Sequence, residues 1–427
     1  MERFIGIFGI IVLLGIAFLM SNNKFKINLW TVLGGLTLQI VIGFLLLRWE
    51  TGVYAIEFLT AKITTFLKLS SYGSQFLFGK LADPAYFDHF GFQFAFILLP
   101  TIIFFSAFTA FLYHIGVLQR VVQLFAWIMN RLMRTSGAES LSCAANMILS
   151  QTEAPLLIRP FLNKMTPSEL CAVMVGGFGT IAGSVMAAYI QMGVPGVQII
   201  IASAMAVPAS LMIAKIIYPE TEVSETANSV KMPKIRMGHN LLDSIAHGIS
   251  DGLHLALNVA AMLIAFIALI AFLDLLLGFF DRVIDGGWLS GEALVGGEFA
   301  GVVPGSLKNL LGTVLAPLTY VMGIPKADIH AVGHLLGLKI ASNEFIAYAE
   351  LAPLIKQGLI SEKAGLMATY MLCGFANFSS IGIQIGGLGV LAPERRSDLA
   401  RLAFRAMLGG AIVSCLTATI AGLLMPG

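Results

Sequence analysis

Long apolar runs recur along the whole chain, and they constrain its fold more than any other feature. A helix of about 20 apolar residues crosses the hydrocarbon core of a bilayer. Only 12% of the 427 residues are charged, roughly half the fraction found in soluble proteins, which is too little for a water-exposed surface of this size. We therefore predict an all-α polytopic protein embedded in the lipid bilayer. A net charge of +2 without a basic stripe excludes a nucleic-acid-binding protein.

The apolar runs predict about eight transmembrane helices. Their expected ranges are 5–20, 27–47, 92–118, 169–193, 197–218, 253–280, 363–391 and 402–425. The amphipathic stretch 121–133 is better suited to the membrane interface than to crossing it. The stretch 312–324 reaches only about 20 Å as a helix, too short for a core about 30 Å thick, so we expect a partial helix there.

Two interrupted segments, 137–163 and 327–357, are predicted to enter the membrane and return on the same side as re-entrant hairpins. Basic clusters favour the cytoplasmic side of a membrane. The four basic clusters of this chain all lie on the cytoplasmic side only if neither hairpin segment crosses the membrane. This assignment places both termini outside. The clusters are Lys24 and Lys26; Arg120, Arg131 and Arg134; Lys231, Lys234 and Arg236; and Arg395, Arg396, Arg401 and Arg405.

The two hairpin segments begin related units. Ala154-Pro155 is followed after 23 residues by Gly177-Phe178, and Ala352-Pro353 is followed after 22 residues by Gly374-Phe375. Helix-start signals lie between them, at 166–169 and 360–363. Because the charge count gives the units opposite orientations, they predict an inverted repeat with broken helices, which in transporters meet at a central binding site.

This repeat organises the chain into four parts. We expect scaffold helices, a periplasmic-side loop and an interfacial helix in 1–136, and the first transport repeat in 137–218. A charged linker, a long scaffold helix and a Gly-rich loop follow in 219–311. The second transport repeat fills 312–427.

Polar residues interrupt both units at their breaks. Glu153 and Glu344 are carboxylates inside apolar hairpins, where burial costs several kcal/mol unless the charge is paired or used, so they are functional candidates. Asn377 and Ser380 share a helix face, and their spacing leaves interhelical packing and ligand contact equally open. Five histidines without metal-ligand spacing are expected to pack or to lie at the interface: His114, His247, His254, His330 and His334.

No nucleotide-binding or hydrolase motif occurs in the sequence, which disfavours an ATP-driven pump and leaves secondary transport. Two alternatives remain open. An intramembrane enzyme would use Glu153 and Glu344 as a carboxylate pair. A channel would need symmetric rings of polar groups rather than two hairpins.

The stretch from Gly337 to Tyr348, GLKIASNEFIAY, resembles the signature G-x-K-x-x-x-N-E-F-V-A-[YMF] of concentrative nucleoside transporters. The one departure is Ile346 in place of Val. The segment 151–155 is similar to the family's first hairpin tip, and 374–380 to its late broken helix. The resemblance runs from about residue 92 to the C-terminus, and the short N-terminus is similar to that of bacterial members.

The resemblance implies a homotrimer in the bacterial inner membrane that imports a nucleoside such as uridine by symport with a cation. It implies that Gln151, Thr152 and Glu153 face the nucleobase, with Val185 lining that pocket. Glu344, Asn377 and Ser380 are expected to hold the ribose hydroxyls, with Phe375 packing nearby. No enzymatic cofactor is expected.

The resemblance also implies a sodium site near the first hairpin tip. Its ligands would be the side chains of Asn146 and Thr180 with the carbonyls of Leu149 and Ile181. Oxygen-only ligands suit a hard cation, so we favour sodium as the coupling ion. Proton coupling is the alternative, and Glu153 or Glu344 would then carry the proton.

Overall fold

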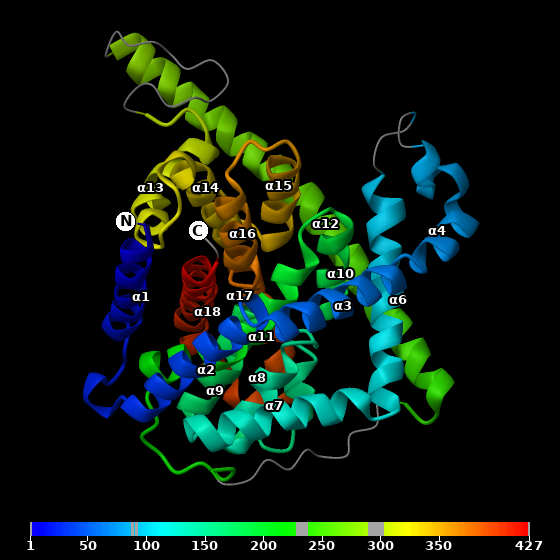
Figure 1. The fold of residues 1–427 in the computed structure, drawn as a ribbon, viewed down its shortest axis with the longest axis vertical. Helices are drawn as coiled ribbons and strands as arrows, with labels where there is room; N and C mark the ends of the chain where they lie inside the picture. Colours follow the sequence, from blue (N-terminus) through cyan, green and yellow to red (C-terminus); the bar gives the residue numbers. More distant parts are fainter. Residues whose placement is uncertain (1, 87–88, 90–92, 228–237, 289–302, 426–427) are drawn as a thin grey trace.

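The computed structural model describes residues 2–86, 89, 93–227, 238–288 and 303–425, and the regular elements in these ranges are all helices (Figure 1). Six of the described helices are long and apolar enough to cross a membrane: Leu29–Leu47, Ala95–His114, Pro167–Gln191, Gly196–Ile217, Leu241–Asp285 and Pro393–Leu424. Two shorter apolar helices, Ile5–Leu19 and Phe378–Leu391, fall on the remaining two predicted spans. The predicted all-α membrane fold is therefore confirmed.

The N-terminal region contains more helix than the sequence predicted. It comprises α1 (Glu2–Leu19), η1 (Lys24–Lys26), α2 (Leu29–Leu47), α3 (Glu50–Leu67), α4 (Ser70–Phe78), η2 (Gly79–Ala82), η3 (Pro84–Tyr86), α6 (Phe94–His114) and α7 (Val117–Met133). The periplasmic-side loop predicted between the spans 27–47 and 92–118 was wrong for residues 50–78, because α3 and α4 occupy them. Gly52, Ile56 and Thr60 are buried at four-residue spacing on α3, so a narrow apolar face supports a helix despite its charges.

The first repeat has the predicted hairpin and broken helix. The hairpin consists of α8 (Gly137–Ala145), an irregular tip, η4 (Ala154–Ile158) and η5 (Leu162–Lys164). The broken helix is α9 (Pro167–Gly179) with α10 (Gly183–Gln191), and α11 (Gly196–Ile217) follows. Reciprocal capping boxes start α8, between Ser136 and Glu139, and α9, between Thr166 and Glu169.

The second repeat follows the long helix α12 (Leu241–Asp281) and its π-helical end η6 (Arg282–Trp288). It comprises α13 (Leu307–Val321), η7 (Lys326–Asp328), the hairpin α14 (Ile329–Ala341) and α15 (Glu344–Lys356), the broken helix α16 (Glu362–Leu372) and α17 (Phe378–Leu391), η8 (Pro393–Arg395) and α18 (Arg396–Leu424). The predicted partial helix at 312–324 corresponds to α13. The basic residues Lys231, Lys234 and Arg236 and most of the Gly-rich loop lie outside the described residues.

The short sequence match between the repeats does not mark equivalent positions. Ala154-Pro155 comes directly after the first hairpin tip, whereas Ala352-Pro353 lies in the last turn of α15, well beyond the break before Glu344. The Gly-Phe match does mark both helix breaks. Gly374 has φ +146°, and a Cβ there would lie 2.8 Å from the carbonyl oxygen of Phe178, so the two breaks can touch only because this residue is glycine.

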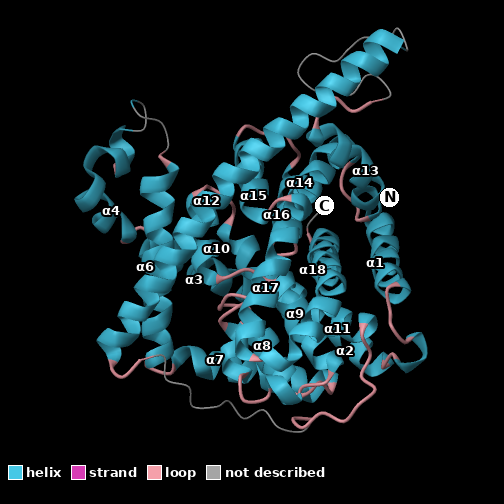
Figure 2. Ribbon diagram, turned by 180° about the vertical axis from the view of Figure 1, so that it is seen from behind, coloured by secondary structure: helices cyan, strands magenta, loops and turns pink. Residues whose placement is uncertain are grey.

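The last helix, α18, packs in the core of the molecule. α18 lies against α9, α11 and α16, and it runs beside α1, so the start of α1 and the end of α18 lie at the same end of the molecule (Figure 1). This agrees with the predicted placement of both termini on one side. Seen from behind, α6 and α12 pack together along one flank of the hairpin elements (Figure 2).

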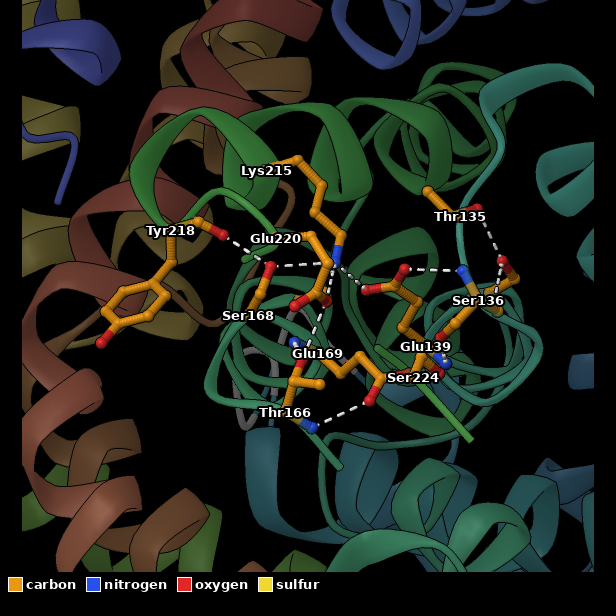
Figure 3. A network of polar contacts seen from close by, with 12 residues as sticks. Thr135, Ser136, Glu139, Thr166, Ser168, Glu169, Lys215, Tyr218, Glu220 and Ser224 are labelled. Carbon is orange, nitrogen blue, oxygen red and sulfur yellow. Dashed lines mark hydrogen bonds and ion pairs between the residues drawn. The ribbon is translucent and has the colours of Figure 1, made fainter. Parts of the chain in front are cut away.

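A buried polar network ties the first repeat together at the end opposite its tip (Figure 3). The ammonium of Lys215 on α11 lies 2.8 Å from Glu139 of α8 and 3.2 Å from Glu220. It also donates a 2.9 Å hydrogen bond to Ser168 at the start of α9. The Lys215 side chain therefore links the helices α8, α9 and α11.

Candidate functional site

All eight predicted substrate residues line a single cavity of about 500 Å³, within the usual range for small-molecule sites. They come from the first hairpin tip, the start of α10, the start of α15 and the second helix break. They are Gln151, Thr152, Glu153, Val185, Glu344, Phe375, Asn377 and Ser380. The chain therefore brings together residues more than 200 positions apart, as the inverted repeat predicts.

Glu344 is the most enclosed carboxylate of the cavity, with 5% of its surface exposed. It begins α15, which Asn343 caps by accepting a 2.9 Å hydrogen bond from the N–H of Ile346. The Tyr189 hydroxyl donates to one carboxylate oxygen and the Asn377 amide to the other, both at 3.0 Å. A carboxylate accepts about four hydrogen bonds, so Glu344 is fixed in place and retains acceptor capacity for a ligand.

Asn377 connects the second break to Glu344. It is the N-cap of α17, where its Oδ1 accepts hydrogen bonds from the Ser380 N–H at 2.8 Å and from the Ser379 hydroxyl at 2.7 Å. Its amide nitrogen is the donor to Glu344. Capping therefore fixes the orientation of the side chain, which presents its N–H groups to the cavity.

The first hairpin tip is held by its own polar side chains. Glu153 accepts a 2.8 Å hydrogen bond from the Ser150 N–H, and the Ser150 hydroxyl accepts a longer one, 3.3 Å, from the Glu153 N–H. The Thr152 hydroxyl lies 3.1 Å from the Ser150 hydroxyl, within hydrogen-bond distance. These bonds satisfy backbone groups that an irregular tip would leave without partners, and they place all three side chains at the cavity.

Gln384 of α17 fixes the position of Gln151, although it was not among the residues predicted from the sequence. Its amide nitrogen donates to Gln151 Oε1 and to the carbonyl of Met174, both at 3.1 Å. A buried amide among the apolar residues of a predicted span was the available signal. The tip of the first hairpin is thereby tied to both broken helices.

The predicted cation ligands lie where two helices end. Asn146 is the C-cap of α8 and Thr180 the C-cap of α9, and helix C-termini carry partial negative charge. Asn146 is fully buried, and neither its Oδ1 nor its Nδ2 has a hydrogen-bond partner among the described residues. The Thr180 hydroxyl donates a 2.8 Å hydrogen bond to the carbonyl of Gly176. Gly176 also lies close to Asn146, because a Cβ on this glycine would lie 3.3 Å from the Asn146 amide nitrogen.

These features fit a hard cation. An orphaned buried amide, a hydroxyl with free lone pairs and two helix C-termini supply uncharged oxygens and negative potential in one place. Leu149 and Ile181, the predicted carbonyl ligands, lie in the adjoining hairpin tip and helix break and are buried. Within the described ranges, no group of three His, Cys, Asp or Glu side chains is arranged to hold a metal ion.

Comparison with known proteins identifies the family. A family profile described as Na+ dependent nucleoside transporter C-terminus matches residues 198–422, and the corresponding N-terminus profile matches 8–81. A profile described as Nucleoside recognition matches 95–196. The chain belongs to the concentrative nucleoside transporter family. It is therefore an integral multi-pass membrane transporter and not an enzyme.

Proteins similar to this transporter align with nearly its whole length. An uncharacterized transporter of Haemophilus influenzae is 42% identical over 98% of this chain and 96% of its own length. Sodium/nucleoside cotransporter 1 of Rattus norvegicus is 40% identical over 99% of this chain and 64% of its own length. The solved structure of CNTnw in an inward-facing substrate-bound state has a TM-score of 0.90 at 38% identity, covering 99% of this chain and 98% of that chain.

Lys339 of the nucleoside-transporter signature has a structural role that was not predicted from the sequence. It is fully buried, and its ammonium donates 2.8 Å hydrogen bonds to the carbonyl of Met371 and to Ser414 Oγ. Met371 lies in the last turn of α16, whose free carbonyls attract a cation. Lys339 therefore joins the second hairpin to the second break and to α18.

The transporter's cavity has a further wall that was not predicted from the sequence. Asp251, His254 and Asn258 of α12 and Ser106 of α6 line it. His254 was expected to pack or to lie at the interface, but the structure places it at the cavity. Polar residues three and four positions apart in a long apolar run were the signal for this wall.

Proposed function

We propose that this transporter imports nucleosides by symport with sodium. The observation that carries the proposal is the convergence of two carboxylates, two amides and hydroxyl groups from both repeats on one cavity. A nucleoside is uncharged and rich in hydrogen-bond donors and acceptors, and this lining complements it. The nucleoside cotransporters among the relatives support the same substrate class.

Ribose recognition is assigned to the second repeat. Glu344 has acceptor capacity left for two hydroxyl donors, and hydrogen bonds to a charged group are worth about 1.5–3 kcal/mol each. Asn377 and Ser380 lie beside it in the cavity, and Phe375 offers an apolar surface. The nucleobase is assigned to Gln151, Thr152 and Glu153, with Val185 lining that end.

Sodium coupling is supported by the orphaned Asn146 side chain and by its position at a helix C-terminus. The proposed ligands Asn146, Thr180, Leu149 and Ile181 contribute uncharged oxygens, which a sodium ion can use directly. The second candidate is proton coupling through Glu153 or Glu344. It is favoured by one observation, that neither carboxylate forms an ion pair with a described residue.

We further propose that the transporter resides in a bacterial inner membrane as a homotrimer. The division into scaffold parts, 1–136 and 219–311, and transport repeats, 137–218 and 312–427, belongs to the same proposal. It is supported by the hairpins and broken helices, which lie in the two proposed repeats. Chemical cross-linking in native membranes tests the assembly: a ladder that ends at three subunits supports a trimer, and one that ends at two contradicts it.

Uptake of radiolabelled uridine into proteoliposomes tests the proposed function. Symport predicts accumulation above the external concentration when a sodium gradient is imposed, and its loss when the gradient is dissipated. A channel would equilibrate uridine without accumulating it. An intramembrane enzyme would convert uridine without moving it, and either result would contradict the proposal.

A further inference from the structure

The long helix α12 presents a polar face to the cavity that the predicted site does not include. Asp251, His254 and Asn258 are three and four residues apart, so they share one side of the helix. All three line the cavity and have exposed side chains. A carboxylate on a membrane helix is costly unless it meets water or a polar ligand, so Asp251 depends on this cavity.

The adjoining face of α12 is packed tightly against α6. A Cβ on Gly248 would lie 2.6 Å from that of Ala110, and a Cβ on Gly252 would lie 2.8 Å from the Cα of Ile103. Such distances leave no room for a side chain, so the two helices form a closely fitted pair. The α6–α12 pair therefore holds the polar face in position, and this pair is separate from the hairpins.

A second cavity of about 400 Å³ continues from the first along the same two helices. Ser106, Glu153, Leu156 and Asp251 line both cavities. Asp251 therefore lies where the two cavities meet, at the same end of the site as Glu153. That is the end assigned above to the nucleobase.

We propose that Asp251 is a specificity-determining residue that favours nucleobases with an exocyclic amino group. This inference rests on the nucleoside function proposed above. A carboxylate is only an acceptor. Cytosine carries an amino donor at its 4-position, whereas uracil carries an acceptor oxygen there. Asp251 accepts a hydrogen bond from the cytosine amino group and repels the uracil oxygen, with His254 and Asn258 completing the polar wall.

The test compares cytidine and uridine in proteoliposomes that contain wild-type protein or Asp251→Asn, at saturating sodium. The amide loses charge but keeps its size. The inference predicts that the cytidine-to-uridine ratio of half-saturating concentrations rises about tenfold in the variant, mainly through weaker cytidine uptake. Asp251→Glu, which keeps the carboxylate, should restore much of the preference. Asp243→Asn, on the same helix but lining neither cavity, should leave the ratio unchanged.

An unchanged ratio in Asp251→Asn, or an equal loss for both nucleosides, would overturn the inference. A second measurement needs no variant: the 2-pyrimidinone riboside, which is cytidine without its amino group, should compete with cytidine about tenfold more weakly than cytidine itself. Equal competition would also overturn it. If wild-type protein accumulates uridine while both tests fail, the nucleoside function stands and only this inference falls; if it accumulates no nucleoside, both fall.

Discussion

The backbone N–H of Phe375 donates a 3.2 Å hydrogen bond to the carbonyl of Thr180. Phe375 lines the substrate cavity, and Thr180 is a proposed cation ligand from the other repeat. The two helix breaks are thus in direct contact, and a shift in one must move or break its bond with the other. This gives a short physical link between cation binding and substrate binding, and it is the reason we expect the two to be coupled.

Glu344→Gln should weaken uridine binding about 10- to 100-fold, because it removes the charged acceptor while preserving shape, a loss of about 1.5–3 kcal/mol. Binding to purified protein measures this directly. In wild-type protein, 2′,3′-dideoxyuridine should compete poorly, since it lacks the donors that Glu344 accepts. Normal uridine affinity in the variant, or equal competition by the dideoxy analogue, would contradict the ribose assignment.

Gln151→Ala should change the preference among bases more than the dependence on ribose. The variant loses the 3.1 Å hydrogen bond with Gln384 and one polar group facing the nucleobase end. Uptake of purine and pyrimidine nucleosides by the same preparation is the measurement. If uptake of both fell by one common factor, Gln151 would have a structural role in the hairpin rather than a role in base recognition.

Lys215→Met should destabilise the folded protein by about 3–5 kcal/mol, since it leaves the buried Glu139 carboxylate without its ion-pair partner. Thermal unfolding in detergent detects the loss. The double variant Lys215→Met with Glu139→Gln should recover much of it, because the stranded charge is then gone. A single variant as stable as wild type would show that the network in Figure 3 contributes little to stability.

Thr180→Val should raise the half-saturating sodium concentration about three- to tenfold, because it keeps shape and removes one oxygen worth about 0.5–1.5 kcal/mol. Uridine affinity at saturating sodium should change little. Uridine uptake measured as a function of sodium concentration separates the two effects. A variant with unchanged sodium dependence would remove Thr180 from the proposed ligand set.

The sequence predicted the parts of the fold that polar interruptions and helix caps mark. Glu153 and Glu344 are conspicuous because carboxylates are rare in apolar segments, and the Thr166–Glu169 capping box announces the start of α9 in four residues. These local signals were sufficient to place both hairpins and both broken helices. The family resemblance then selected residues that the structure places around one cavity.

Other features were not predictable, because they depend on which helices meet. Gln384, Lys339 and Asp251 are single polar residues in apolar helices, and periodicity alone does not say whether such a residue faces lipid, protein or a cavity. The helix α3 was missed for a related reason. Its buried face is narrow, and its charges made the segment look like a loop.

We propose that sodium, bound beside Asn146, stabilises the substrate-binding form of the cavity. Uridine affinity of the purified transporter at fixed pH, in sodium and in choline, tests it most directly, with Asn146→Ala as the matched variant. We predict that replacing sodium by choline weakens uridine binding at least about tenfold, a coupling free energy of about 1.4 kcal/mol, and that Asn146→Ala raises the sodium concentration needed to restore it. Equal affinity in sodium and choline, with uridine binding that instead follows pH, would contradict the claim and assign coupling to Glu153 or Glu344.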